Sequence, residues 1–398
     1  MEGLTMELVF WISVGLIGYT YAGYPLLLLV MASLQQMRRD LSFALGHNRR
    51  KNFRDPELPC VSLIFAAHNE AAVIVEKMRN CAAIDYPAGK LEILAGCDAC
   101  SDNTAALARN AGVANATVFD YRERCGKPAV LNRLVAAAKG EIVVFCDANT
   151  MFEAHAVRSL VRHFSSPAVG CACGELRLRP SETGPRNEGF YWRYEGCLKF
   201  FESRLNMLVG ANGGIFAVRR SLFRPLPARA IVDDFLIAME IRRQGHQVVF
   251  DCDAAGYEMA AASVREEFVR RVRIGAGNFH ALLMTWRMLL PGAGRIAFSY
   301  WSHKVLRWIA PFAMLTAFGA AVALSSRPFY ALCAFAGVAL GMAGLLGYRQ
   351  ALRSIHRGVW ATPYYFLSMN LALLIGFWKF VSGQQGAVWQ RTPRHREL

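Results

Sequence analysis

The feature that most constrains the fold of this chain is a run of 27 residues without a charged side chain, Leu8–Leu34. A helix needs about 20 mainly apolar residues to cross the hydrocarbon layer of a bilayer, so the run predicts a transmembrane helix. A removable signal peptide is the alternative, but the run is too long and no positive charge precedes it. Three further apolar segments, about Val305–Leu324, Phe329–Leu346 and Pro363–Phe377, predict spans near the other end.

Between these ends lies a charged portion of about 250 residues, long enough to form a core of its own. The 398 residues are 54% apolar and 19% charged, with a mean hydropathy of +0.23, which is an average over two unlike parts. This composition excludes a disordered or fibrous protein. It also disfavours a protein built wholly from membrane helices.

The apolar and charged segments divide the chain into six expected parts. They are an N-terminal transmembrane helix at 1–37, a basic linker at 38–58, an α/β domain at 59–279, interfacial helices at 280–303, about three transmembrane segments at 304–382 and a basic tail at 383–398. The stretch His280–Leu290 is too short to span a bilayer, and its apolar residues with a single Arg287 fit an interfacial helix.

The positions of Lys and Arg predict how the chain crosses the membrane. Six basic residues follow the first span: Arg38, Arg39, Arg49, Arg50, Lys51 and Arg54. The positive-inside rule predicts a multi-pass membrane protein with its N-terminus outside and the α/β domain in the cytoplasm. Four spans would leave the basic tail outside, against the rule. Either the last apolar segment, interrupted by Lys379, is re-entrant or the tail breaks the rule.

The net charge of +15 and the 11 cysteines bear on the partners of the protein. Positive residues gather beside the spans, at 38–54 and 265–273, which favours membrane lipids and an anionic substrate over nucleic acid. The pairs Cys97-x-x-Cys100 and Cys171-x-Cys173 raise the alternative of a zinc site. Buried reduced thiols are the preferred interpretation, because no matching ligand pair lies at a finger-like spacing.

Residues 59–150 alternate between predicted strands and helices. The strands are Val61–Ala66, Leu91–Gly96 and Glu141–Cys146, with helices after the first two, through about Ala83 and at about Asn103–Ala111. This alternation predicts a doubly wound parallel sheet, which binds its ligands beyond the carboxyl ends of the strands.

Polar side chains stand at all three of these strand ends: Asn69 with Glu70, Asp98 with Asp102, and Asp147 with Asn149. Such side chains can grip a base and ribose, and Asp-x-Asn offers the hard oxygen ligands that Mg²⁺ or Mn²⁺ prefers. No glycine-rich phosphate loop follows the first strand, which argues against kinases, ATPases and dinucleotide oxidoreductases. The clusters therefore predict a site for a nucleoside diphosphate.

In this order and spacing, the motifs make the chain resemble a membrane-bound family 2 glycosyltransferase with a GT-A fold, similar to cellulose and hyaluronan synthases. The stretch Cys97–Thr104 resembles SDGSTDGT, Arg124–Asn132 resembles RxGKxxALN, and Asp147–Asn149 stands at the DxD motif. Gly210–Gly214 resembles GAxGA, Val232–Asp234 stands where the family has TED, and Arg270–Ile274 stands at Q/RxxRW. The implied fold is α/β, with a Rossmann-like, mostly parallel sheet and flanking transmembrane helices.

The resemblance implies an inverting, metal-dependent hexosyltransferase of the bacterial inner (cytoplasmic) membrane that uses a nucleotide-sugar, with a UDP-sugar as the expected donor. Asp234 would be the catalytic base, with Asp233 orienting it or raising its pKa. The donor would lie against Asn69, Glu70, Asp98, Lys127, Asp147, Arg270 and Arg273, and Mg²⁺ or Mn²⁺ on Asp147 and Asn149. The acceptor side would be Gly210, Ala211, Asn212, Gly213 and Ile274.

Two departures from the family pattern bear on the function. Asn149 replaces a carboxylate of DxD, which lowers the expected metal affinity, and Ile274 replaces a Trp that stacks on the acceptor sugar in processive synthases. Transfer to a lipid-linked or oligosaccharide acceptor is therefore at least as well supported as growth of a long polysaccharide. The alternatives are a catalytically inactive assembly subunit with polysaccharide-export partners and, with only Lys379 and a few prolines to support it, a transporter.

The region Glu188–Glu202 is rich in aromatic residues and predicts a helix, which could stack on sugars, lie on the membrane or simply pack as an amphipathic helix.

Overall fold

The computed structural model describes residues 2–45, 57–179, 188–259, 264–353 and 358–384. Four helices in these ranges are long and apolar enough to cross a membrane: Gly3–Ala44, Arg295–Ala323, Pro328–Leu352 and Ala361–Val381. The four apolar segments predicted from the sequence are thus all helical. The basic tail and most of the predicted linker lie outside the described residues.

The N-terminal helix is continuous but changes its hydrogen-bonding pattern midway. It consists of α1 (Glu2–Gly18), the π-helical η1 (Tyr19–Gly23) and α2 (Tyr24–Ala44), so the helix continues into the predicted basic linker. A second continuous helix consists of α10 (Arg295–Ser299), the π-helical η6 (Tyr300–Val305) and α11 (Leu306–Ala323). Two more follow, α12 (Pro328–Leu352) and α13 (Ala361–Val381).

An eight-stranded sheet with the order β3-β2-β1-β4-β7-β6-β8-β5 forms the centre of the α/β domain. Its strands are β1 (Val61–Ala67), β2 (Leu91–Asp98), β3 (Ala116–Tyr121), β4 (Ile142–Cys146), β5 (Met151–Phe152), β6 (Val169–Arg179), β7 (Ile215–Arg219) and β8 (Gln247–Met259). The pairs from β3 to β4 and the pair β6–β8 are parallel, whereas β7 and β5 pair antiparallel. The predicted α/β sheet is confirmed as a mixed one. Its three predicted strands are β1, β2 and β4.

Helices cover both faces of the sheet because its central strands are apolar on both faces. Every residue of β1 and of β4 is buried, as expected for strands of a covered parallel sheet. The covering helices are α3 (Ile74–Ala82), α4 (Thr104–Asn110), α5 (Lys127–Ala137), α6 (Ala156–Val161) and α8 (Asp233–Arg243). Short 3₁₀ turns, η2 (Arg162–Ser165) and η3 (Arg220–Leu222), complete this domain.

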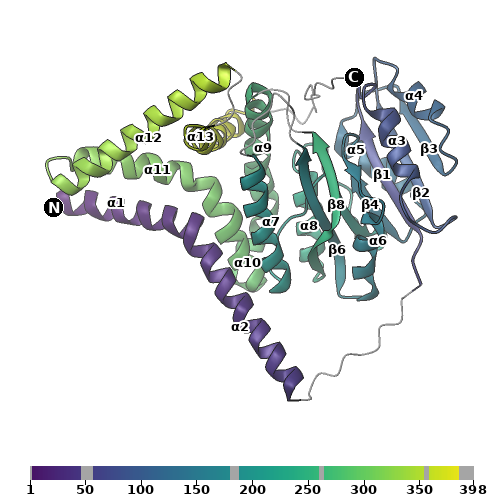
Figure 1. Ribbon diagram of the computed structural model, residues 1–398, viewed down its shortest axis with the longest axis horizontal. Helices are drawn as coiled ribbons and strands as arrows, with labels where there is room; N and C mark the ends of the chain where they lie inside the picture. The colour runs from purple at the N-terminus through teal and green to yellow at the C-terminus, as the bar shows by residue number, and fades with distance from the viewer. Residues whose placement is uncertain (1, 46–56, 180–187, 260–263, 354–357, 385–398) are drawn as a thin grey trace.

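Two long helices, α7 (Glu188–Arg204) and α9 (Val264–Thr285), stand between the sheet and the membrane helices (Figure 1). The predicted helix at Glu188–Glu202 is confirmed as α7. After α9 come the 3₁₀ turns η4 (Trp286–Leu289) and η5 (Pro291–Ala293), where large apolar side chains such as Trp286 and Leu290 are exposed. The predicted interfacial stretch is therefore divided: its first residues belong to α9, its last residues belong to the continuous helix that begins with α10, and the short turns η4 and η5 lie between them.

Small residues bring α9 and α13 into close contact. A Cβ atom placed on Gly376 of α13 would lie 2.8 Å from the backbone nitrogen of Ala276 in α9. Phe279 of α9 packs edge-on against Phe377 of α13, with ring centroids 5.0 Å apart. This contact joins the α/β domain directly to an apolar helix of the C-terminal part.

Candidate active site

A cavity of about 980 Å³ lies between the carboxyl ends of the strands and the membrane helices. Most of the predicted site residues line it: Glu70, Lys127, Asp147, Asn149, Gly210, Ala211, Asn212, Gly213, Asp233, Asp234, Arg270, Arg273 and Ile274. Residues that are separated in the sequence by up to about half the chain thus line one cavity. The site is formed where the sheet meets α7, α8 and α9.

Asp233 and Asp234 are the first two residues of α8. Burial and the neighbouring charge of Asp233 raise the pKa of Asp234 to about 6. Gly213 lies next to this carboxyl group, because a Cβ added at this glycine would be in van der Waals contact with Asp234 Oδ2, at 3.5 Å. A carboxyl group with this pKa is half deprotonated near pH 6 and can accept a proton from a hydroxyl group at neutral pH.

Lys127 connects the two acidic parts of the site. Its Nζ donates to Asp147 Oδ1 at 2.9 Å and lies 3.1 Å from Asp233 Oδ2. Burial alone would lower the pKa of Lys127, but the two carboxylates raise it above its usual value, so the ammonium group stays charged. Lys127 is held at the N-terminus of α5, after Gly126, whose φ of +83° a residue with a side chain rarely adopts.

Asp147, Asn149 and Glu258 supply oxygen atoms to the same part of the cavity. Asn149 Nδ2 donates to Glu258 Oε1 at 2.9 Å, and the Asp147 side chain keeps about a third of its surface exposed. The carboxylate oxygens of Asp147 and the amide oxygen of Asn149 are hard ligands of the kind that Mg²⁺ or Mn²⁺ prefers. The ammonium group of Lys127, between Asp147 and Asp233, shows that this part of the cavity holds a positive charge. The residues present therefore fit a divalent ion.

Asn149→Asp is expected to strengthen metal binding and to weaken the protein without metal. In the native chain, Asn149 donates a hydrogen bond to Glu258. The variant loses this hydrogen bond and brings its new carboxylate into repulsive contact with the carboxylate of Glu258. In chelator, we expect the variant to unfold at a lower temperature than the native chain. Adding Mn²⁺ should raise the unfolding temperature of the variant more, because its Kd for the metal is expected to be about tenfold lower. An equal response of both proteins to Mn²⁺ in a thermal shift titration would argue against metal at this position.

Arg270, Arg271 and Arg273 follow one another on α9 but are held differently. Arg270 Nε lies 2.8 Å from Glu267 Oε2, and Arg271 also pairs with Glu267. Burial and the charge of Arg270 lower the pKa of Arg273, while the charges of Asp233 and Asp147 act in the opposite direction. Arg273 thus faces the acidic centre, as expected of a residue that meets a diphosphate.

The glycine-rich stretch 210–214 forms the wall beside Asp234. Gly210 has φ of +93°, and an added Cβ would meet the ring of Phe235 at 3.1 Å. Asn212 donates through Nδ2 to the carbonyl of Gly174 at 2.6 Å and accepts from Lys199 of α7. Both contacts fix the wall in place, so a hydroxyl group beside Asp234 meets backbone rather than mobile side chains.

Two predicted donor residues, Asn69 and Asp98, do not line this cavity. Asp98 is buried and accepts from the backbone nitrogens of Cys125 and Gly126, at 2.8 and 2.9 Å. Asn69, with a positive φ of 56°, accepts from the backbone nitrogen of Ser101 at 2.8 Å. Both side chains shape the loops at the strand ends, and their contact with a nucleoside stays a prediction.

Three functional candidates escaped the sequence reasoning: Lys199, Glu258 and Glu267. Glu267 lies one turn before the arginines of α9, and its i, i+3 and i, i+4 spacing from Arg270 and Arg271 could have predicted these ion pairs. Glu258 lies on β8, where the sequence gives no comparable pattern. Lys199 is buried in α7 and meets Asn212 across the fold, which no local pattern reveals.

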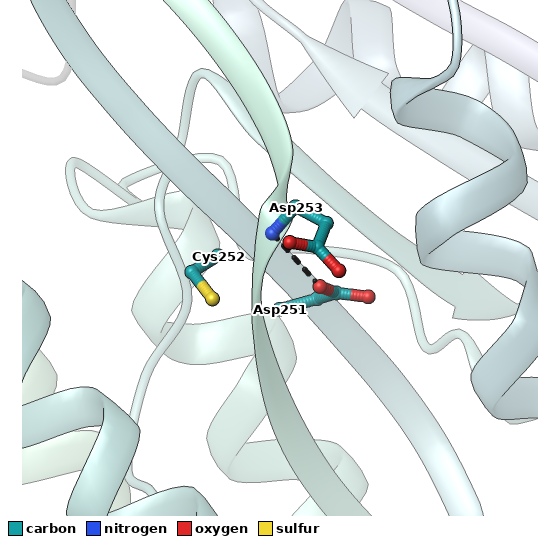
Figure 2. A group of neighbouring side chains, drawn as sticks. All are labelled: Asp251, Cys252 and Asp253. Atoms are coloured by element: carbon teal, nitrogen blue, oxygen red, sulfur yellow. Dashed lines mark hydrogen bonds between the residues drawn. The ribbon is translucent and has the colours of Figure 1, made fainter.

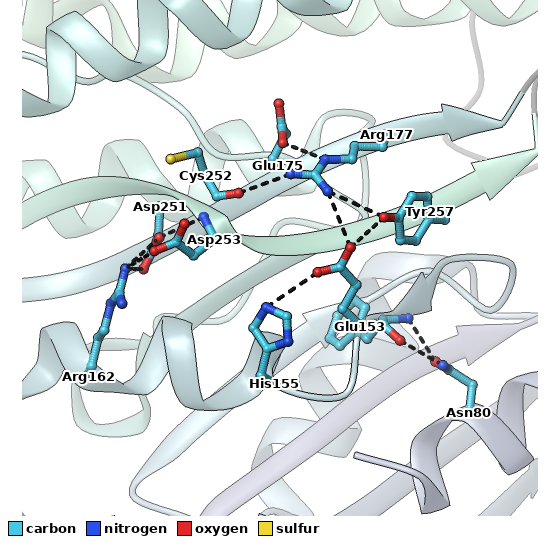
Figure 3. Close-up of polar contacts among 11 residues, drawn as sticks. Asn80, Glu153, His155, Arg162, Glu175, Arg177, Asp251, Cys252, Asp253 and Tyr257 are labelled. Carbon is cyan, nitrogen blue, oxygen red and sulfur yellow. Dashed lines mark hydrogen bonds and ion pairs between the residues drawn. The ribbon is translucent and has the colours of Figure 1, made fainter. Parts of the chain in front are cut away.

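A second acidic group lies on β8, outside the residues that line the cavity: Asp251 and Asp253 beside Cys252 (Figure 2). Arg162 Nη2 lies 2.8 Å from Asp251 and 2.9 Å from Asp253, and His163 Nε2 lies 2.7 Å from Asp251 (Figure 3 shows Arg162). Although burial opposes it, hydrogen bonding with His163 helps hold the pKa of Asp251 below its usual value. The carboxylates are thus already paired, and we interpret the group as a structural ion network.

The same figure shows how this edge of the sheet is held together. Arg177 of β6 reaches Glu153, Glu175 and the hydroxyl group of Tyr257, at 3.2, 2.7 and 3.3 Å (Figure 3).

The cysteines show no zinc-like grouping among the described residues: Cys97, Cys171 and Cys173 are buried thiols of the sheet, as predicted, whereas Cys60, Cys197 and Cys252 are exposed.

Residues 58–277 match the family described as Glycosyltransferase like family 2, and the chain belongs to that family. The cavity, the paired acidic residues of α8 and the mixed sheet therefore belong to a family 2 glycosyltransferase.

Two curated relatives are identical to this chain at about a quarter of the aligned positions. A poly-beta-1,6-N-acetyl-D-glucosamine synthase of Staphylococcus aureus (strain COL) is 25% identical over 260 residues, which is 62% of this chain and 60% of the synthase. The probable glycosyltransferase YdaM of Bacillus subtilis (strain 168) is 25% identical over 255 residues, 59% of this chain and 58% of YdaM. The chain thus spans about three fifths of the length of these relatives.

A solved structure shares the fold along nearly the whole chain. The mannosyltransferase PcManGT from Pyrobaculum calidifontis, in complex with GDP-Man and Mn²⁺, has a TM-score of 0.71 and 23% identity. The match covers 95% of this chain and 100% of that chain, so the shared fold includes both the α/β domain and most of the apolar helices.

Proposed function

We propose that this chain is an inverting hexosyltransferase that moves a sugar from a nucleotide-sugar to a lipid-linked or growing polysaccharide acceptor at the membrane. The observation that carries the proposal is one cavity in which Asp234, a carboxyl group with a raised pKa, faces the Lys127–Asp147 pair. A UDP-sugar is the donor implied by the resemblance. The GDP-Man of the mannosyltransferase structure makes GDP-sugars a second set to test.

The reaction is a direct displacement at the anomeric carbon. Asp234 accepts the proton of an acceptor hydroxyl group as its oxygen bonds to that carbon, and the bond from the carbon to the diphosphate breaks. The diphosphate leaves with the electron pair, and Lys127 and Arg273 stabilise its charge. Because attack comes from the face opposite the leaving group, the configuration of the sugar inverts.

Asp147 and Asn149 would hold a divalent ion. The Mn²⁺ in the mannosyltransferase structure supports this part of the proposal. The chemistry of this ion would be to neutralise diphosphate charge. The ammonium group of Lys127 would also neutralise diphosphate charge. It pairs with both Asp147 and Asp233 and so offsets the repulsion between these two carboxylates.

The pKa of Asp234 predicts how transfer depends on pH. The base must be deprotonated, and its pKa of about 6 means that it is protonated below pH 6. We expect kcat/KM to rise with pH, to level off above about pH 7, and to fall about tenfold for each pH unit well below 6. A pH profile of kcat/KM that stays flat from pH 5 to 8 would contradict a base with this pKa.

The proposal is tested by incubating membranes that contain the protein with a panel of UDP- and GDP-sugars. We expect one donor to be consumed with formation of the nucleoside diphosphate, and no consumption by membranes that carry the Asp234→Asn variant. If the chain is instead an inactive assembly subunit, which Asn149 and Ile274 would favour, the purified protein binds neither UDP nor GDP in calorimetry with Mn²⁺ present.

For the topology, we propose three crossings, with α13 lying at the membrane surface. The helices α1, α11 and α12 run across the view in Figure 1, whereas α13 is seen nearly end-on beside α9. Arg271 Nη2 of α9 donates to Tyr365 of α13 at 3.4 Å, and Phe279 packs on Phe377, so the two helices stay together over several turns. Since α9 belongs to the domain with the active site, this supports an α13 on the cytoplasmic side.

This arrangement predicts that the C-terminal tail is cytoplasmic, in agreement with its Arg residues and the positive-inside rule. A green fluorescent protein fused after Leu398 should fluoresce, and alkaline phosphatase fused there should be inactive. The reverse pattern would mean that α13 crosses the bilayer. The same two reporters fused within the external turn 325–327 serve as the opposite control.

A further inference from the structure

The helix α3 carries a lysine on the face that packs against the sheet. The other buried residues of this face, Ile74, Met78 and Cys81, are apolar and follow the i, i+4 and i+7 spacing of a core-facing helix. Lys77 lies among them and has no exposed surface. An ammonium group loses its hydration when it is buried, so an apolar residue would be the less costly choice at this position. The contacts of Lys77 show what the lysine does there.

The surroundings of the Lys77 ammonium group suit a cation. Nζ lies 5.6 Å from the ring centroid of Phe65 and 4.8 Å from that of Phe152, and it donates to the carbonyl oxygen of Thr150 at 2.5 Å. Aromatic faces and carbonyl oxygens both present negative charge to a cation. Although burial opposes the charged form, the neighbouring groups, Asp147 among them, raise the pKa of Lys77, so the group is charged at neutral pH.

The carbonyl that Lys77 holds belongs to the turn that carries Asp147 and Asn149. The backbone nitrogen of Thr150 donates to the carbonyl of Asp147 at 3.1 Å, which closes this turn. The next turn of α3 holds the strand that follows, because the side chain of Asn80 exchanges two hydrogen bonds of 2.8 Å with the backbone of Phe152 (Figure 3 shows Asn80). The helix α3 therefore fixes the segment 147–152 at two points.

The same segment is also held by β8 and by two glycines. Met151 and Phe152 of β5 pair antiparallel with β8. A Cβ added at Gly214 would lie 2.9 Å from Thr150 Oγ1, and one added at Gly256 would lie 3.0 Å from Thr150 Cγ2. Thr150 is thus enclosed by backbone on the side of these glycines and cannot move away from Lys77, so the buried cation stays directly behind the turn.

A buried cation behind this turn acts in opposite directions on the two ligands proposed for the site. It repels a divalent ion on Asp147 and Asn149, and it attracts the diphosphate of a nucleotide. Both effects are stronger than at the protein surface, because the interior screens charge less than water does. Loss of a residue that only packs would instead loosen the turn and weaken the binding of both ligands. The signs of the two changes therefore distinguish the two roles.

We propose that Lys77 is a positioning residue of the donor site, which fixes the turn at Asp147 and Asn149 through Thr150 and attracts the donor diphosphate with its buried charge. Lys77 lies outside the cavity lining, so it acts on the ligands without touching them. The inference rests on the proposed transfer function, because it concerns the residues that would hold the nucleotide-sugar. The binding of metal and nucleotide can be measured without turnover, so the two proposals fail separately.

The test uses calorimetry on the purified full chain in detergent, with Mn²⁺ alone and then with UDP or GDP at saturating Mn²⁺. Lys77→Gln removes the charge but can still donate a hydrogen bond to the carbonyl of Thr150. We expect this variant to bind Mn²⁺ about threefold more tightly and UDP or GDP about tenfold more weakly than the native chain. Lys77→Met also loses the hydrogen bond, so its gain in Mn²⁺ affinity should be smaller and its loss of nucleotide affinity at least as large.

Two further variants serve as matched controls. Asn80→Ala removes the two hydrogen bonds to Phe152 and loosens the same segment without a change of charge, so it should weaken the binding of both Mn²⁺ and the nucleotide. Lys139→Gln removes the charge of an exposed lysine that precedes β4, at the end of the strand away from the cavity. It should leave both affinities unchanged.

Three results would overturn the proposal. Lys77→Gln could weaken both ligands as Asn80→Ala does, or neither Lys77 variant could show a cooperative unfolding transition, and Lys77 would then have a structural role alone. Both Lys77 variants could keep the native affinity for UDP and GDP. A native chain that binds Mn²⁺ but neither UDP nor GDP would contradict the proposed function, while the Mn²⁺ affinities would still test the charge of Lys77. A native chain that binds none of these ligands would contradict both proposals.

Discussion

Asp234→Asn is expected to lower the rate of sugar transfer by about 10³-fold, within the range found for the loss of a general base. The carboxyl group lines the cavity beside Gly213, and an amide in its place cannot accept the proton of the acceptor hydroxyl group. The nearly equal size of Asn leaves the N-terminus of α8 and its packing unchanged. The measurement is kcat with the donor that the panel identifies.

The control for this variant is Asp120→Asn, an exposed aspartate on β3 that pairs with Arg109 at 3.0 Å. It should keep native activity. Binding of the nucleoside diphosphate should be close to native in Asp234→Asn, because the donor phosphates are expected at Lys127, Asp147 and Arg273. An Asp234→Asn protein with native kcat would remove Asp234 from the catalytic role.

Asp147→Asn is expected to have the second largest effect, a loss of about 10²-fold in kcat/KM, because it removes both the charge of the proposed metal ligand and the partner of Lys127. The loss should be accompanied by a weaker effect of Mn²⁺ on the unfolding temperature. That thermal measurement needs no donor or acceptor, so it separates metal binding from catalysis.

The control here is Asp253→Asn on β8, in the acidic group that Arg162 already pairs. It should leave the response to Mn²⁺ unchanged. If Asp253→Asn rather than Asp147→Asn abolished the Mn²⁺ response, the metal would bind at the β8 group instead of in the cavity.

The parts of the fold with strong periodic or compositional signals could be predicted from the sequence. The strands β1, β2 and β4 are short and apolar and are buried on both faces, and the spans are long charge-free runs. Their order gave the class of fold. The antiparallel strand β7 and the long β8 were not predicted, because pairing between distant segments leaves no local signal.

The candidate site was predictable as a set of residues but not as a network. The motifs named Asp147, Lys127 and Asp233, whereas the contact of Lys127 with both carboxylates depends on how α5 and α8 pack at the sheet edge. Asp98 also accepts hydrogen bonds from the backbone nitrogens of Cys125 and Gly126, and the motifs gave no indication of these contacts.

The proposed position of α13 also rests on contacts between segments that lie far apart in the sequence. Its apolar composition is that of a span, but its contacts with α9 are made through Gly376 and Phe377 at positions that hydropathy does not distinguish. The sequence therefore left the side of the tail open.

The most direct test of the central claim is the anomeric configuration of the transferred sugar, determined by NMR on the product formed from the donor that the panel identifies. A single displacement with Asp234 as the base predicts inversion, so an α-linked nucleotide-sugar yields a β-linked product. A product that retains the α configuration would contradict the mechanism.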